Sequence, residues 1–407
     1  MSIRISTSQT FTQGTNAILD NQSKVSLTQL QLSKGTRILK PSDDPIGSSV
    51  ALNLQRQIDN TTQYIANGQA AQARLAVEDS VMDNVSTILG RVRELALLGA
   101  NGTLNHTDRE AICIEIEQRY DELLGLANTQ LSSGEYLFSG FQSNVQPFSK
   151  NGTGSVVYNG DQGVQMINVN STVQVESGNS GDAVFMNIPT GNGSFVTGAD
   201  DNNTGSGVIG SAVMDDPTAY VGDVYTIDFS LDGGGNLVYQ VTGANTGPVY
   251  AAPLPSFDED GVVTFNGISY TISGLPAPGD SFTVEPSYAQ DVFTSVKQIV
   301  DALKKSTDTD ALQATFRNAL GVGMKNLDQA ITHMDEVRAG VGSRLNVIES
   351  ETNINESLQV EAKSALSLIV DLDYASAVTE LNKQTLALQA AQQSFVKIQG
   401  LSLFEFI

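Results

Sequence analysis

The segment VMDNVSTILGRVREL, residues 81–95, decides the fold class. Its apolar side chains recur at alternating steps of four and three residues, which is the pattern of a helix packed along another helix. The same steps run through residues 320–348, in the second half of the chain. The two segments therefore predict a long antiparallel helical rod. Its predicted core consists of Val81, Val85, Ile88, Val92, Leu95, Leu320, Met324, Leu327, Ile331, Met334, Leu345 and Ile348.

A narrower apolar seam lies near each end of the chain. Residues 11–39 place an apolar side chain at every seventh position, and residues 374–398 resume the four-three rhythm before an apolar C-terminus. This spacing is also typical of an ordinary intramolecular bundle. A pair of such helices nevertheless leaves half of each stripe exposed, so we expect both ends to fold only on assembly. The predicted assembly interface is Phe11, Ile18, Val25, Leu32, Leu39, Leu381, Leu388, Phe395, Ile398, Leu403 and Phe404.

The middle of the chain has a different composition. Residues 151–290 hold 15 acidic residues, no Lys or Arg, and 22 of the 37 glycines. Asn266-Gly267 separates two runs rich in β-branched residues and predicts a hairpin with a type I′ turn. The segments that begin at Gly222 and Gly279 share a Gly-Asp-x-aromatic-Thr-aliphatic pattern and predict two equivalent strand starts. In contrast, residues 187–218 read as a long mobile loop. The middle is therefore expected to be a Gly-rich β domain.

These segments give an α+β organisation with three predicted parts. Residues 1–44 and 365–407 are terminal assembly helices that we expect to be disordered in the monomer. Residues 45–145 and 289–364 form the rod, in which Thr107 and Glu110 predict a capping box and a helix over 108–130. Residues 146–288 form the inserted outer domain. Because aromatic residues make up 6% of the chain and Trp is absent, large aromatic cores are not expected.

Charge and hydropathy exclude several classes of function. The 22 basic residues face 45 acidic residues, for a net charge of −23. Nucleic acid and anionic membrane surfaces both require a cationic face, so neither is an expected partner. No apolar run is long enough for a membrane span or for the core of a cleaved signal peptide. Cys113 is the one cysteine of the chain, which excludes an intrachain disulfide.

No constellation of residues points to catalysis. His106 and His333 lie on different flanks without a second ligand at i+4, so a zinc helix is not predicted. Cys113 has no nearby His and reads as a packed thiol. The acids at 258–260 lack the spacing of a calcium loop and are expected in a turn. We therefore expect no cofactor, no metal and no enzymatic activity.

Sequence motifs in both flanks resemble a known family. LSKGTRI (32–38) followed by PSDDP (41–45) is similar to the N-terminal signature of the flagellin superfamily, and RVRELA (91–96) resembles its first long helix. The resemblance implies a structural protein of the bacterial flagellum with terminal helices that line a tube. It also implies export as an unfolded chain through the flagellar type III apparatus, to an extracellular location.

Three further motifs resemble one branch of that family, the hook-associated proteins of the hook-filament junction. They are SGEYLFSG (133–140), GDSFTVEP (279–286) and LSLFEFI (401–407). The resemblance implies a ring of identical copies, with a neighbouring hook-associated protein and flagellin as partners. An export chaperone is expected on the C-terminal helix.

Two other functions remain open from the sequence. The chain could be a filament flagellin, because the terminal motifs are common to the whole superfamily. It could also carry an adhesive or carbohydrate-binding module on a helical stalk. The absence of Trp weighs against stacking on sugar rings. An enzymatic middle domain ranks third.

Overall fold

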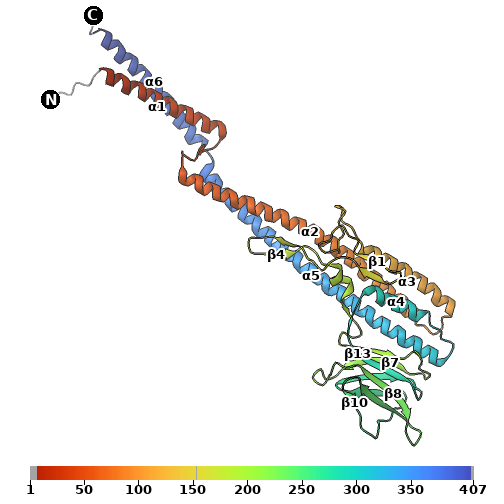
Figure 1. Ribbon diagram of the computed structural model, residues 1–407. Coiled ribbons are helices and arrows are strands. Elements are labelled where there is room, and N and C mark those ends of the chain that lie inside the picture. Colours follow the sequence, from red (N-terminus) through yellow and green to blue (C-terminus); the bar gives the residue numbers. More distant parts are fainter. Residues whose placement is uncertain (1–6, 153, 405–407) are drawn as a thin grey trace. The chain divides into compact units, whose positions relative to one another are not determined.

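Figure 1 shows the fold as a computed structural model, which describes the backbone of residues 7–152 and 154–404 and their side chains except at 7, 8, 211 and 398–404. Long helices occupy both flanks, and short strands occupy the middle. The helices are α1 (Thr7–Lys34), α2 (Pro45–Gly99), α3 (His106–Ala127), α4 (Val292–Leu303), α5 (Asp310–Val370) and α6 (Tyr374–Phe404). A π-helical turn, η1, spans Asp182–Met186.

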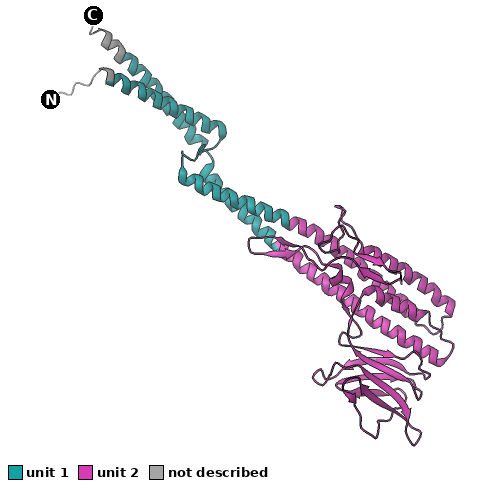
Figure 2. Cartoon of the chain, viewed as in Figure 1, with its two compact units in different colours: residues 1–67, 350–407 teal, residues 68–349 magenta. Residues whose placement is uncertain are grey.

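The chain divides into two compact units (Figure 2). One consists of residues 1–67 and 350–407, and the other of residues 68–349. The division falls within α2 and α5, so each of these helices contributes to both units.

In the first unit, α1 and α6 lie side by side (Figure 1). The Phe11 and Phe395 rings meet edge to face with centroids 5.1 Å apart. Thr28 Oγ1 donates a hydrogen bond of 2.8 Å to Gln384 Oε1. Gly14 permits the close approach, because a Cβ there would lie 2.7 Å from a ring carbon of Phe395. The two terminal seams thus face each other within one chain.

In the second unit, the start of α3 differs from the expected one. Asn105 is the N-cap and accepts a hydrogen bond of 2.9 Å from the Asp108 backbone N–H. Asp108 in turn accepts one of 3.2 Å from the Asn105 N–H. The prediction of a box between Thr107 and Glu110 was wrong, since the pair two residues earlier closes the same reciprocal geometry.

The core of the second unit is one apolar cluster between α2, α3, α4 and α5. Of the twelve predicted rod residues, nine belong to this cluster and are at most 7% exposed. The other three, Met324, Ile331 and Leu345, are half-buried against it. An aromatic group completes this cluster, contrary to the expectation from composition. Loops and short elements outside the helical repeats supply most of its rings. They belong to Tyr120, Phe138, Phe148, Tyr158, Phe185 and Phe293.

Short antiparallel hairpins flank this core. β1 (Phe148–Lys150) pairs with β2 (Val156–Tyr158), and β3 (Met166–Asn168) pairs with β4 (Gln174–Glu176). A third pair joins β5 (Ile188–Pro189) to β14 (Ala289–Gln290).

Two antiparallel sheets form the outer part of the insert around a separate apolar cluster. The five-stranded sheet has the order β10-β9-β8-β13-β6, and the three-stranded sheet has the order β11-β12-β7. Their strands are β6 (Phe195–Ala199), β7 (Val208–Met214), β8 (Tyr225–Leu231), β9 (Leu237–Gly243), β10 (Gly247–Pro248), β11 (Val262–Phe265), β12 (Ile268–Ser273) and β13 (Ser281–Pro286).

The predicted hairpin at Asn266-Gly267 is confirmed. Both residues have positive φ, 44° and 74°, and they join β11 to β12. The prediction of a mobile loop over 187–218 was wrong, because this range contains β5, β6 and β7. The many glycines of this range obscure the strand pattern of β6 and β7, which pair with β13 and β12 respectively.

The two Gly-Asp segments play equivalent parts. Asp223 precedes β8 and accepts backbone hydrogen bonds from Asn245 and Thr246, while Asp280 precedes β13 and accepts them from Thr204 and Gly205. Each buried carboxylate therefore fastens a neighbouring loop to the start of a strand. β8 and β13 pair with each other, so both fastenings belong to the same sheet.

Candidate functional site

The predicted terminal seam is used largely within the chain. Ile18, Val25 and Leu32 on α1 are half-buried, as are Leu381, Leu388 and Phe395 on α6. Phe11 is 39% exposed. The side chains of Ile398, Leu403 and Phe404 lie outside the described residues.

Leu39 does not belong to the helical seam. α1 ends at Lys34, because Gly35 adopts a left-handed φ of 70° that terminates the helix. Leu39 lies in the following turn, where its N–H donates to Asp43 Oδ2 at 3.1 Å. The seven-residue repeat in the sequence therefore extends beyond the C-terminal end of α1.

A second apolar stripe on each terminal helix stays exposed. At 100° per residue, each set lies on one face of its helix, offset from the seam. These side chains are Leu19, Leu27 and Leu30 on α1, and Val378, Leu386 and Val396 on α6. Leu19 is 56% exposed and Leu386 is 68% exposed. Exposed apolar stripes of this kind mark interaction surfaces.

Sequence reasoning missed this second stripe. Each of its members lies outside the seven-residue repeat that identifies the seam, and Leu19 directly follows the seam residue Ile18. A search for a second apolar face on the same helix would have found it. In the same unit, the side chains of Ile46, at the start of α2, and Leu368, near the end of α5, are also exposed. Leu368 is 84% exposed.

A buried carboxylate cluster ties α2 to α5 within the second unit. Glu78 on α2 is fully buried and accepts hydrogen bonds from the Asn179 N–H at 3.1 Å and Nδ2 at 2.6 Å. Arg344 on α5 donates to Asn179 Oδ1 at 2.9 Å and pairs with Glu176 at 2.9 Å. The loop after β4 thus bridges the two helices.

Burial raises the pKa of Glu78 to about 7, although the bonds from Asn179 and the charges of Arg344 and Arg74 act in the opposite direction. Glu78 Oε2 has no hydrogen-bond partner among the described residues. The charged carboxylate is therefore poorly compensated in the fold.

We predict that Glu78→Gln removes a pH dependence of stability. A carboxyl whose folded pKa lies above its ordinary value of 4.5 stabilises the fold at low pH, and this stabilisation is lost as pH rises through about 7. The free energy of unfolding of the native chain should fall by up to about 3 kcal/mol between pH 4.5 and 8, relative to the variant.

Urea unfolding at several pH values measures this difference. Glu94→Gln is a matched control, since Glu94 is an exposed partner of Arg91 on the same helix. Parallel pH profiles for the native chain and the Glu78 variant would contradict the prediction.

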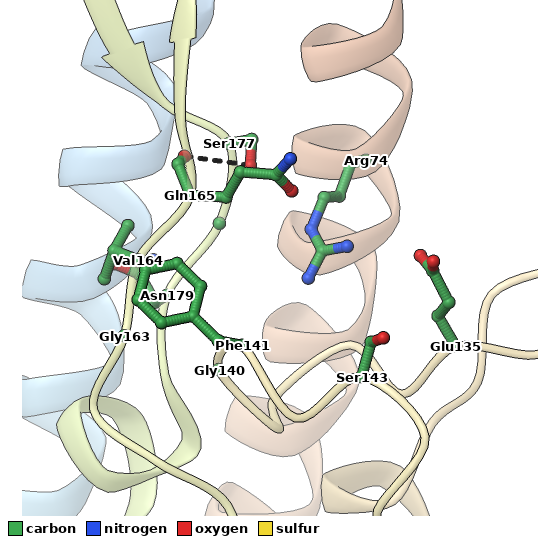
Figure 3. Close-up of a pocket in the computed structure, with 11 residues that line it drawn as sticks. Arg74, Glu135, Gly140, Phe141, Ser143, Gly163, Val164, Gln165, Ser177 and Asn179 are labelled. Atoms are coloured by element: carbon green, nitrogen blue, oxygen red, sulfur yellow. Dashed lines mark hydrogen bonds between the residues drawn. The ribbon is translucent and has the colours of Figure 1, made fainter.

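Next to this cluster, a cavity of about 340 Å³ opens between α2 and the loops around it (Figure 3). The Arg74 side chain projects toward it from α2, and the ring of Phe141 lies at its edge. Arg74 Nη2 donates to the Leu137 carbonyl at 3.0 Å, and Ser177 Oγ donates to the Gln165 carbonyl at 3.1 Å. These bonds hold the loops that follow α3 and β4.

The remaining candidates for chemistry are placed apart. Cys113 is buried, with Sγ 3.8 Å from the Val300 carbonyl, and burial raises the pKa of this thiol. His333 Nε2 lies 2.8 Å from the Ala183 carbonyl. Within residues 7–152 and 154–404, no cluster of three or more His, Cys, Asp or Glu is arranged to hold a metal. No helix in that part of the chain has the length and hydropathy to cross a membrane.

Comparison with known proteins shows what the chain is similar to. Residues 5–143 match the bacterial flagellin N-terminal helical region, and residues 324–407 match the bacterial flagellin C-terminal helical region. Flagellar hook-associated protein 3 of Escherichia coli K12 is 25% identical over 404 residues, which cover 99% of both chains.

Solved structures give the same picture. Hook-associated protein 3 of Legionella pneumophila is 32% identical, with a TM-score of 0.75 over 78% of this chain and 98% of that one. FlgL of Xanthomonas campestris is 31% identical, with a TM-score of 0.71 over 77% of this chain and 99% of that one. These likenesses include the inserted β-rich part as well as the helices.

Proposed function

Because the chain belongs to the bacterial flagellin family, we propose that it acts as the hook-associated protein that joins the flagellar hook to the filament. The observation that carries this proposal is the match to hook-associated protein 3 over 99% of both chains. One solved relative, from Legionella pneumophila, is described as a flagellar junction protein. Filament flagellin is the less favoured alternative, because the matches that cover 99% of both chains, and the solved structure with a TM-score of 0.75, are hook-associated proteins.

The mechanism that we propose is structural. Copies of the chain form a ring, and the exposed stripes of α1 and α6 become buried against neighbouring subunits. When α1 and α6 pair within a single chain, the buried residues among those described in these two helices are Thr28 and Ala377. So thin an interface supports the proposal that residues 1–44 and 365–407 are disordered or frayed in the monomer. We keep residues 45–145 with 289–364 as the rod and 146–288 as the outer domain.

Partners and location follow as parts of the same proposal. The neighbours are further copies of this chain, another hook-associated protein and flagellin. The stripe of Val378, Leu386 and Val396 on α6 offers an apolar face for an export chaperone. Export through the flagellar type III apparatus would place the chain outside the cell without a cleaved signal peptide. In this proposal the rod and the terminal helices form the contacts between subunits, and no enzymatic role is proposed.

Immunogold labelling of intact flagella tests the junction role. We expect label confined to the distal end of the hook. Deletion of the gene should leave hooks in place while flagellin is released into the medium. Label along the whole filament would instead support the flagellin alternative.

A further inference from the structure

Polar side chains of α5 cover the open edge of β7. Asn318 Oδ1 accepts a hydrogen bond of 2.8 Å from the Ile209 N–H, and Asn318 Nδ2 donates to the Gly207 carbonyl at 3.0 Å. Two helical turns later, Lys325 Nζ lies 3.4 Å from the Gly210 carbonyl and 3.5 Å from Thr197 Oγ1. Both contacts of Lys325 are at the long limit for a hydrogen bond.

Lys325 differs from the ion-paired lysines of this unit in having no counter-ion. Lys304 pairs with Glu117 at 2.8 Å and Lys305 with Asp201 at 2.9 Å. For Lys325, no carboxylate among the described residues lies within 4.0 Å. Asp328, three residues further along α5, is engaged by Arg93 of α2 at 2.6 Å.

The surroundings of the Lys325 amine disfavour its charged form. β6 and β7, which pack against this part of α5, carry no charged residue. Asp328, which lines the same cavity as Lys325, is paired with Arg93. Burial lowers the pKa of Lys325, with no opposing contribution from a nearby acid.

A cavity of about 230 Å³ adjoins the amine, between α5 and the outer strands. Its size fits a ligand of a few heavy atoms. The lining includes amide and hydroxyl groups beside an apolar wall, contributed by Asn192, Phe195, Thr197, Ala212 and Gln329. A small carbonyl compound in this cavity can therefore place its carbonyl carbon beside Lys325 Nζ and its oxygen near hydrogen-bond donors.

We propose that Lys325 is a reactive amine of this chain, a modification site for small aldehydes. The neutral Nζ attacks the carbonyl carbon, and the C=O π electrons move to oxygen. The carbinolamine then loses one water molecule to give an imine, a step with no net oxidation or reduction. Lysines that are desolvated in this way are the ones that proteins use to form Schiff bases.

Reductive trapping tests the proposal on the full-length chain. The protein is incubated with propionaldehyde and cyanoborohydride at pH 7.5, and each lysine adduct is quantified by peptide mass spectrometry. Adduct formation at Lys325 should be severalfold faster than at Lys304, because the desolvated Lys325 amine has no carboxylate partner and the Lys304 amine is held in its charged form by Glu117. This advantage should shrink as pH approaches 10.5, where ordinary lysines also lose their protons.

Two controls separate reactivity from mere position. In urea, where the fold is lost, Lys325 and Lys304 should react at similar rates. The Lys325→Arg variant keeps the positive charge at this position and should lose this one adduct while the other lysines react as before. A native rate at Lys325 equal to or below that at Lys304 would overturn the proposal and leave Lys325 as a cover for the β7 edge.

Discussion

A chain that carries Leu19→Glu and Leu386→Glu should incorporate into flagella at least about 100-fold less than the native chain, since each 1.4 kcal/mol of lost association is a factor of ten. Both side chains are more than half exposed in the chain by itself, on the second stripe of α1 and α6. Burying a carboxylate without a partner in an apolar contact costs several kcal/mol. The monomer, in which the same positions face water, should unfold at the same urea concentration as before.

The matched control is Ala387→Glu. Ala387 is exposed on α6 and lies about 100° around the helix from both Leu386 and the seam residue Leu388, on the side opposite Val378 and Val396. This variant adds the same charge to the same helix and should incorporate normally. Swarming on soft agar and quantitative labelling of purified flagella measure the effect. Normal incorporation of the double variant would show that the stripes are not assembly contacts.

Phe185→Ala should destabilise the second unit by about 3–5 kcal/mol, the range for removal of a buried aromatic ring. Phe185 is fully buried in η1. Its ring lies 5.1 Å from Phe138, 5.3 Å from Phe148 and 6.2 Å from Phe293, centroid to centroid. Loss of the ring removes all three of these contacts, which link η1 to the segments after α3 and to α4.

Urea unfolding of the purified chain measures this loss. Phe141→Ala removes the same atoms from a side chain that is 67% exposed, and it should cost under about 1 kcal/mol. Phe185→Leu, which keeps an apolar side chain at the site, should fall between the two. Equal unfolding midpoints for Phe185→Ala and Phe141→Ala would contradict the assigned role of the cluster.

The aromatic cluster shows where sequence reasoning reaches its limit. Val81 and Leu320 can be assigned to the core because their spacing repeats over several helical turns. Phe138, Phe148 and Phe185 lie in loops and short elements, which have no period to detect. Only the tertiary fold brings them to the same helices, so a low aromatic content did not preclude an aromatic core.

The outer domain shows the same limit in its strands. The Asn266-Gly267 turn carries a local signal that is sufficient by itself. β6 and β7 are recognisable chiefly from their partners. β6 pairs with β13 about 85 residues later and β7 with β12 about 60 residues later, and such distant pairing leaves no local pattern.

The terminal helices show a related limit. Their seams could be predicted from the sequence as faces that pack against another helix. The exposed stripes could not be predicted in the same way, because identifying them requires knowing which face of α1 packs against which face of α6.

Amide hydrogen exchange, followed in the monomer and in assembled flagella, tests most directly whether the chain ends fold by burial against other subunits. In the monomer, residues 7–34 and 374–397 should exchange within seconds, while residues 81–95 stay protected. In assembled flagella both ends should become as slow as the rod. Slow exchange of both ends in the monomer would contradict the proposal that assembly buries and orders them.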